Sequence, residues 1–327
     1  MAIHPARLTA AAALVGLALA ACSTENVGQP AGATAGAGKT TEVKTLQFVN
    51  PLPSEPVWKQ INDCMKEEAE SKGIAFTASG PPASKPGDPA VMIQQVQDAT
   101  AAGKDAIVTF PASGAFGPVL QQAQKKGVIT ATLYGDGTPE SGATVNAGVD
   151  WTEIGKQYVD AIAKLPGDHK VGLVAEGPTG IGKSWTDGVE AAAKGTNNVQ
   201  IVAKVFIGAD ASKALPQVTN LLTAHPDVDI VASNTGLMTQ GAVAALKSKG
   251  LDGKVKLLVI NNANGGPEAV RNGAAIGVYL QDLCDLAKRT VQGVIEASSG
   301  QKVPLVTVKA VIATKDDLQE YLDKGWQ

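Results

Sequence analysis

Aromatic residues, histidine and cysteine are all scarce in this chain of 327 residues, in which Phe, Trp and Tyr together make up 4%. The three histidines, His4, His169 and His225, form no cluster with cysteine, and neither an HExxH nor a GxSxG motif occurs. The chain therefore lacks the residues on which metal-dependent and acyl-transfer enzymes usually depend, and we expect no metal and no cofactor. The net charge is −3 without a basic cluster, so no nucleic-acid partner is expected. With so few aromatic residues, each tryptophan is a candidate for a specific role.

The chain begins with an apolar run that is too short to cross a membrane. Residues 8–21 are 14 uncharged residues that follow Arg7, whereas a spanning helix needs roughly 18 to 20. We therefore interpret residues 1–21 as an export signal. The sequence LAAC at residues 19–22 resembles a lipobox, which would make Cys22 the lipidated first residue of the mature protein; ordinary signal cleavage is the alternative. Two or more acyl chains at Cys22 would anchor the protein stably to the outer face of the cell membrane.

The next segment, residues 22–43, is rich in Gly, Ala, Thr and Ser and has almost no large apolar side chains, as expected of a flexible tether. The remaining chain, about 280 residues, is long enough for two domains. Besides Cys22, only Cys64 and Cys284 remain. An even pair in an oxidising compartment indicates either a disulfide or two unpaired buried thiols.

Short apolar runs alternate with helix-like segments from residue 44 onward. The runs are TLQFVN, IAFTAS, AIVTF, VITATLY, KVGLVAE, VQIVAKVF, DIVASN, VKLLVIN and AIGVYL. Continuous apolar strands that alternate with helices ending at glycine predict parallel sheets covered on both faces. Residues 105–127 and 229–250 repeat the order of strand, Gly-bearing loop, helix and Lys-Gly stop, which indicates two similar lobes. We expect a ligand between them, beyond the carboxyl ends of the strands.

The sequence GPTGIGKS at residues 177–184 matches the pattern of a nucleotide-binding P-loop and lies between an apolar run and a helix-like segment. A P-loop ATPase also needs an acidic residue at the end of a neighbouring strand, to hold Mg²⁺. The runs AIVTF, DIVASN and VKLLVIN end in Phe or Asn. Glycines at a helix start also simply permit a tight turn. We therefore expect no enzyme, and keep a P-loop NTPase only as an alternative.

Three longer segments carry a family resemblance: VQDATAAGKDAIVTFPAS, ASNTGLMTQGAVAALKSKG and INNANGGPEAVRNGAAIGVYLQD. With them, residues 44–327 resemble the ribose-type periplasmic binding proteins, the substrate-binding subunits of ABC importers. GPP at residues 80–82 and GPTG at 177–180 are similar to the autoinducer-2 and rhamnose-binding branch. The resemblance implies a type I periplasmic binding protein fold of the α/β class, with two doubly wound Rossmann-like lobes and parallel sheets. A three-strand hinge would join lobes made of residues 44–149 plus 282–309 and 150–281 plus 310–327.

The resemblance also implies which residues face the ligand. Trp58 would stack on a sugar ring, unless it packs in the core, and Asp150 would either bond the ligand or cap the next helix. Asn262 falls at a hydroxyl-bonding position, with Asn261 as the neighbouring possibility. Glu55, in the same loop as Trp58, either contacts the ligand or is only a solvated charge. Ala209 falls where ribose binders have Phe, so Trp185 would either substitute for it or pack in its lobe. The implied set is Trp58, Tyr134, Asp150, Trp151, Lys183, Trp185, Asn234, Asn262, Tyr279 and Gln281.

These features together predict a binding protein that captures a small neutral solute, a monosaccharide or a sugar alcohol, and delivers it to an ABC permease. Sensing of an autoinducer-like diol is the alternative. We expect a monomer anchored to the membrane by lipid. The family's architecture places the helices of Cys64 and Cys284 in one lobe, so the resemblance implies a disulfide between them.

Overall fold

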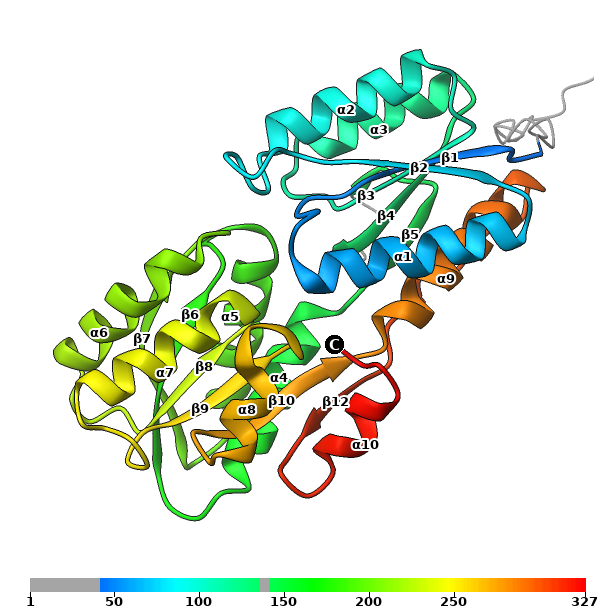
Figure 1. The fold of residues 1–327 in the computed structure, drawn as a ribbon. Helices are drawn as coiled ribbons and strands as arrows, with labels where there is room; N and C mark the ends of the chain where they lie inside the picture. Colours follow the sequence, from blue (N-terminus) through cyan, green and yellow to red (C-terminus); the bar gives the residue numbers. More distant parts are fainter. Residues whose placement is uncertain (1–41, 136–140) are drawn as a thin grey trace, which may run out of the picture. The chain divides into compact units, whose positions relative to one another are not determined.

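The computed structural model describes residues 42–135 and 141–327 (Figure 1). The expected signal peptide, Cys22 and nearly all of the expected tether lie outside these residues. Among the helices that are described, none combines the length and the apolar character that crossing a membrane requires.

The first sheet is entirely parallel, with the strand order β11-β5-β4-β3-β1-β2. Its strands are β1 (Thr45–Val49), β2 (Ala75–Ser79), β3 (Ala106–Thr109), β4 (Ile129–Gly135), β5 (Val145–Gly148) and β11 (Val306–Thr307). The helices α1 (Pro56–Ser71) and α9 (Leu283–Ser298) pack side by side on one face, and α2 (Pro89–Ala101) and α3 (Phe116–Lys125) cover the other (Figure 1). We call this sheet with its helices the N-terminal lobe.

The second sheet has the strand order β12-β10-β9-β8-β6-β7. Its strands are β6 (His169–Ala175), β7 (Val199–Phe206), β8 (Ile230–Ser233), β9 (Lys256–Ile260), β10 (Ala275–Gln281) and the antiparallel edge strand β12 (Ala310–Ala313). Around it lie α4 (Trp151–Ala163), α5 (Gly180–Ala193), α6 (Ala214–Ala224), α7 (Thr239–Ser248), α8 (Gly266–Arg271) and α10 (Leu318–Asp323). The helices α4 and α5 pack against each other, as do α6 and α7. We call this sheet with its helices the C-terminal lobe.

The chain passes between the two sheets three times: after β5, after β10 and between β11 and β12. The α/β class, with two mainly parallel sheets, agrees with the sequence prediction. The antiparallel edge strand β12 was not foreseen. It arises because the chain returns from the first sheet by a short connection and runs back along β10.

Local sequence explains where the helices begin and end. The carboxylates of Asp88, Asp150 and Asp282 accept hydrogen bonds from backbone N–H groups at the starts of α2, α4 and α9. Gly103 and Gly127 follow α2 and α3 with φ of 71° and 85°, a conformation that glycine adopts without strain. The helices α2, α4 and α9 follow β2, β5 and β10, so their capped starts lie on the side of the carboxyl ends of these strands.

Cys64 on α1 and Cys284 at the start of α9 form a disulfide, with their Cα atoms 5.3 Å apart. This is the pairing that the resemblance implied. It joins two adjacent helices of the N-terminal lobe that are 220 residues apart in the sequence.

Candidate ligand-binding site

Loops at the carboxyl ends of the strands enclose a cavity of about 600 Å³ between the two lobes. The N-terminal lobe contributes residues from the loops after β1, β2 and β3 and from the end of β4, and the C-terminal lobe from the loops after β6, β7, β8 and β9. This is the place where parallel sheets commonly bind ligands. The side chains discussed below are Glu55, Trp58, Phe110, Tyr134, Trp151, Glu176, Asn234, Thr235 and Asn261.

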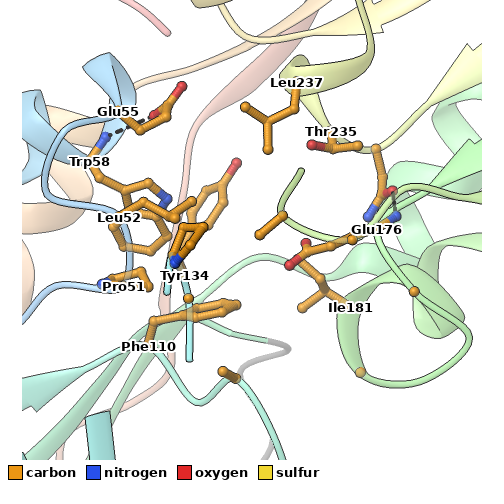
Figure 2. Close-up of a pocket in the computed structure, with 18 of the residues that line it drawn as sticks. Pro51, Leu52, Glu55, Trp58, Phe110, Tyr134, Glu176, Ile181, Thr235 and Leu237 are labelled. Atoms are coloured by element: carbon orange, nitrogen blue, oxygen red, sulfur yellow. Dashed lines mark hydrogen bonds between the residues drawn. The ribbon is translucent and has the colours of Figure 1, made fainter. Parts of the chain in front are cut away.

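One wall of the cavity is aromatic (Figure 2). Trp58 meets Phe110 and Tyr134 edge-to-face, at ring-centroid distances of 5.4 and 5.7 Å, and Tyr134 meets Trp151 in the same way at 5.6 Å. Trp58 lies in the first turn of α1, whose start is fixed by Pro56 and by the cap from Glu55. The four rings, three from the N-terminal lobe and Trp151 from the start of α4, pack edge-to-face and give this side of the cavity an apolar surface.

Tyr134 occupies the centre of this wall in a strained conformation. Its φ of 62° lies in the left-handed region, which costs a non-glycine residue roughly 1–2 kcal/mol. Its hydroxyl donates to Oε1 of Gln281, and burial raises the pKa of Tyr134 well above its usual value. Tyr134 therefore presents its ring to the cavity, while its hydroxyl is already bonded across the hinge.

The opposite wall, from the C-terminal lobe, combines polar side chains with the apolar side chains of Ile181 and Leu237 (Figure 2). The backbone N–H of Glu176 donates to Oδ1 of Asn234 at 3.1 Å, which orients the Asn234 amide. Nδ2 of Asn234 is buried without a partner among the described residues, and so is Oδ1 of Asn261. Thr235, which directly follows Asn234, also faces the cavity (Figure 2). Buried polar atoms without protein partners indicate positions at which a ligand forms hydrogen bonds.

Three carboxylates, those of Glu55, Asp88 and Glu176, line the cavity, and Asp88 caps α2. Glu55 caps α1 by accepting from the N–H groups of Val57 and Trp58, and its Oε1 accepts from Nδ2 of Asn264 in the other lobe at 3.3 Å. Burial raises the pKa of Glu55, and these hydrogen bonds partly offset the effect. The half-buried Glu176 carboxylate has no hydrogen-bond or ion-pair partner among the described residues, and burial raises its pKa to about 7.

Three of the expected ligand residues lie elsewhere. Lys183 is exposed on α5 and pairs with Asp187 one helical turn away. Trp185 is fully buried and meets Tyr158 of α4 edge-to-face, with the ring centroids 5.5 Å apart. It therefore packs inside its lobe and does not substitute for the aromatic residue that is missing at Ala209. Asp150 is exposed and accepts from the N–H of Glu153, as a helix cap does.

Three more expected residues do not line the cavity. Nδ2 of Asn262 donates to the backbone oxygen of Trp326 at 3.4 Å, and its neighbour Asn261 is the one that lines the cavity. Tyr279 packs against Tyr158, and Gln281 is fully buried under Tyr134. Of the expected set, the cavity is lined by Trp58, Tyr134, Trp151 and Asn234.

Sequence reasoning missed Glu176, Phe110 and Thr235. Each follows an apolar strand directly, as the last letter of KVGLVAE, the last of AIVTF and the residue after DIVASN. Position at a strand's carboxyl end was therefore the signal that could have found them.

Two glycines of the P-loop-like motif have structural roles, Gly180 because its φ is 59° and Gly182 because of close packing. A Cβ atom at Gly182 would lie 2.4 Å from the backbone oxygen of Gly177, so the first turn of α5 packs directly on its own preceding loop. Lys183 points to solvent, toward Asp187. The motif is thus explained without a phosphate.

Two lobes with parallel sheets, and a cavity between them at the carboxyl ends of the strands, define the class of two-lobe solute-binding proteins. The sequence model of the periplasmic binding protein domain matches residues 46–302, and the chain belongs to this family. It is accordingly a binding protein and not an enzyme, which sets the P-loop alternative aside.

Curated relatives and solved structures agree with this assignment. The chain is 25% identical to the ribose import binding protein of Salmonella typhimurium, over 79% of this chain and 86% of the relative. It is 26% identical to the D-allose-binding periplasmic protein of Escherichia coli, over 77% and 84%. A glucose-galactose binding protein from Geobacillus stearothermophilus superposes with a TM-score of 0.80 at 20% identity, over 85% of this chain and 99% of that one. The myo-inositol binding protein of Caulobacter superposes with a TM-score of 0.76 at 19% identity, over 85% and 95%.

Proposed function

We propose that this protein captures a small polyhydroxylated solute, a monosaccharide or a sugar alcohol, and delivers it to the permease of an ABC importer. The observation that carries the proposal is the cavity itself, in which an aromatic wall faces polar atoms that have no protein partner. A flat apolar ring surface fits the C–H face of a sugar, while amides bond its hydroxyls. The relatives named for ribose, allose and myo-inositol support the same solute class.

Capture would involve closure of the two lobes, residues 44–149 plus 282–309 and residues 150–281 plus 310–327. The cavity takes side chains from both, so a bound solute would bridge them and favour the closed state. The hydrogen bond from Asn264 to Glu55 already joins the lobes at the edge of the cavity. Among the ten residues expected to face the ligand, Trp58, Tyr134, Trp151 and Asn234 are those we propose contact it.

We further propose that the protein is exported as a monomeric lipoprotein, anchored to the outer face of the cell membrane through Cys22. The LAAC sequence at residues 19–22 supports this proposal. Replacement of Cys22 by Ser should release the protein from the membrane fraction or block its processing. Fractionation of the mutant with membranes, as for the parent, would contradict lipid anchoring at Cys22.

A sensor of an autoinducer-like diol is the second candidate, because Gly177, Thr179 and Gly180 of the GPTG loop line the cavity. A thermal-shift screen of the purified protein with sugars, alditols and autoinducer-like diols would distinguish the two. A ligand at 100 times its dissociation constant should add about 2.7 kcal/mol to the free energy of unfolding. Stabilisation by a diol alone would favour the sensor, and the absence of any stabilised sample would contradict both candidates.

A further inference from the structure

The cavity carries an excess of negative charge. Glu55, Asp88 and Glu176 line it, whereas Lys85, which is exposed, is the one basic residue among the described residues of the lining. Glu55 and Asp88 are both occupied as helix caps. Glu176 is therefore the carboxylate whose hydrogen-bonding capacity is left for a ligand.

The environment of Glu176 is unfavourable for a bare carboxylate. Its own backbone N–H bonds Asn234, but its side-chain oxygens receive no donor from the described residues. Removing a carboxylate from water without a counter-charge is costly, so the empty site favours whatever brings positive charge to it. A hydroxyl group of a neutral solute supplies one donor and no charge. An ammonium group supplies three donors and a full counter-charge, and its hydrogen bonds to a carboxylate are correspondingly stronger.

The wall opposite Glu176 suits a cation as well. Figure 2 shows Glu176 on one side of the cavity and Trp58, Tyr134 and Phe110 on the other. Aromatic faces attract ammonium groups through the ring quadrupole, most strongly where water is excluded. The same wall also accepts the apolar face of a sugar ring or of an extended polyol. A carboxylate that faces an aromatic wall thus serves a ligand that has both a cationic group and a C–H surface.

We propose that the solute is an amine-bearing polyol, an amino sugar or an amino alditol, whose ammonium group binds the Glu176 carboxylate. This inference rests on the proposed function, since it specifies the solute of the same cavity. Glu176 is then the residue that selects for the amine, and Asn234 and Asn261 bond the hydroxyl groups through their unpartnered Nδ2 and Oδ1 atoms. The same excess of carboxylates rejects sugar acids and sugar phosphates.

The test compares matched pairs of solutes that differ by one amine. Calorimetric titration of the purified full-length protein would use glucosamine against glucose, 1-amino-1-deoxysorbitol against sorbitol, and 2-amino-1,3-propanediol against glycerol. We expect at least one amine to bind tenfold or more tightly than its hydroxyl partner. In Glu176→Gln, which keeps the shape and removes the charge, this preference should fall below about twofold.

Asp187→Asn is the matched control, because it removes one negative charge from α5 outside the cavity and should preserve the preference. Equal or tighter binding of the hydroxyl partners, or an amine preference that survives in Glu176→Gln, would overturn the inference. If the hydroxyl partners bind equally or more tightly, the proposed capture of a polyol would stand. Failure of both members of every pair to bind would overturn the inference and count against the proposed function as well.

Discussion

The hydroxyl of Tyr134, at the end of β4, donates to the side-chain oxygen of Gln281, at the end of β10, so a buried hydrogen bond joins the two lobes behind the cavity. The two residues are 147 positions apart. The side-chain amide of Gln281 forms one hydrogen bond there, because its Nε2 has no partner among the described residues. The bond therefore fixes both the ring of Tyr134 and the inner edge of the hinge.

Tyr134→Phe should show how much this hydrogen bond contributes to the free energy of unfolding. The substitution keeps the ring and removes the donor, which leaves the whole Gln281 amide buried without a partner. A buried polar group that loses its partner costs about 1–3 kcal/mol, and we expect a loss of that size in urea unfolding. The double substitution Tyr134→Phe with Gln281→Met should cost clearly less than the sum of the two single substitutions. Strict additivity would contradict the coupling.

Trp58 and Trp185 offer a matched pair of tryptophans, one lining the cavity and one in the core of the C-terminal lobe. Trp58→Leu should weaken solute binding tenfold or more, because it removes one of the two tryptophan rings of the aromatic wall. Trp185→Leu should leave the affinity nearly unchanged and lower the free energy of unfolding by about 3 kcal/mol, as expected for a large core side chain. Calorimetric titration and urea unfolding of both variants would check this. An affinity loss confined to Trp185→Leu would reverse the two roles.

Glu176 should make the stability of the empty protein depend on pH. Its pKa in the folded protein is about 7, against an ordinary value of 4.5, so the folded state holds the proton more tightly than the unfolded state. The stabilisation is complete below pH 4.5 and is lost as the pH rises through 7. The shift corresponds to a loss of up to about 3 kcal/mol. Glu55, Lys85, Asp88 and Tyr134 also line the cavity and remain unchanged in the variant described next.

Glu176→Gln has no proton to lose, so its advantage over the parent should be small at pH 5 and reach about 3 kcal/mol at pH 8. Urea unfolding at both pH values measures it, and Asp187→Asn, outside the cavity, should show no such change. A difference between Glu176→Gln and the parent that is the same at pH 5 and pH 8 would contradict the raised pKa.

The sequence predicted the sheets and the general place of the site because continuous apolar runs and glycine stops depend on local patterns. It could not predict side-chain directions. Lys183 and Glu176 lie in the same strand-to-helix segment, and only the orientation of the first turn of α5 sends Lys183 to solvent. Likewise, Trp58 and Trp185 both lie in early turns of helices, and the packing of α4 against α5 decides that Trp185 is buried.

The aromatic wall could not be foreseen either, because it depends on the backbone of Tyr134. A tyrosine with φ of 62° contradicts the usual preference of the residue, and nothing in VITATLY signals it. The wall holds this conformation through contacts from three separate segments, Trp58, Trp151 and Gln281. Strain of this kind is characteristic of functional sites.

The disulfide between Cys64 and Cys284 should stabilise the N-terminal lobe without affecting capture. It closes a loop of 220 residues and joins α1 to α9, and neither cysteine lines the cavity. The chain-entropy estimate for such a loop is on the order of 4–5 kcal/mol. The double substitution Cys64→Ser with Cys284→Ser should therefore lower the free energy of unfolding by up to that amount. Because both helices belong to one lobe, the solute affinity should stay within about twofold of the parent.

Thiol titration in denaturant without reductant tests the bond itself. The chain has three cysteines, so a Cys22→Ser background leaves Cys64 and Cys284 alone and should show no free thiol. Addition of reductant should release two thiols and lower the midpoint of urea unfolding to that of the double serine variant. Because the bond lies outside the hinge, reduction should leave the response to solute intact. Two free thiols before reduction, in protein exported from the cell, would show that the cysteines are unpaired.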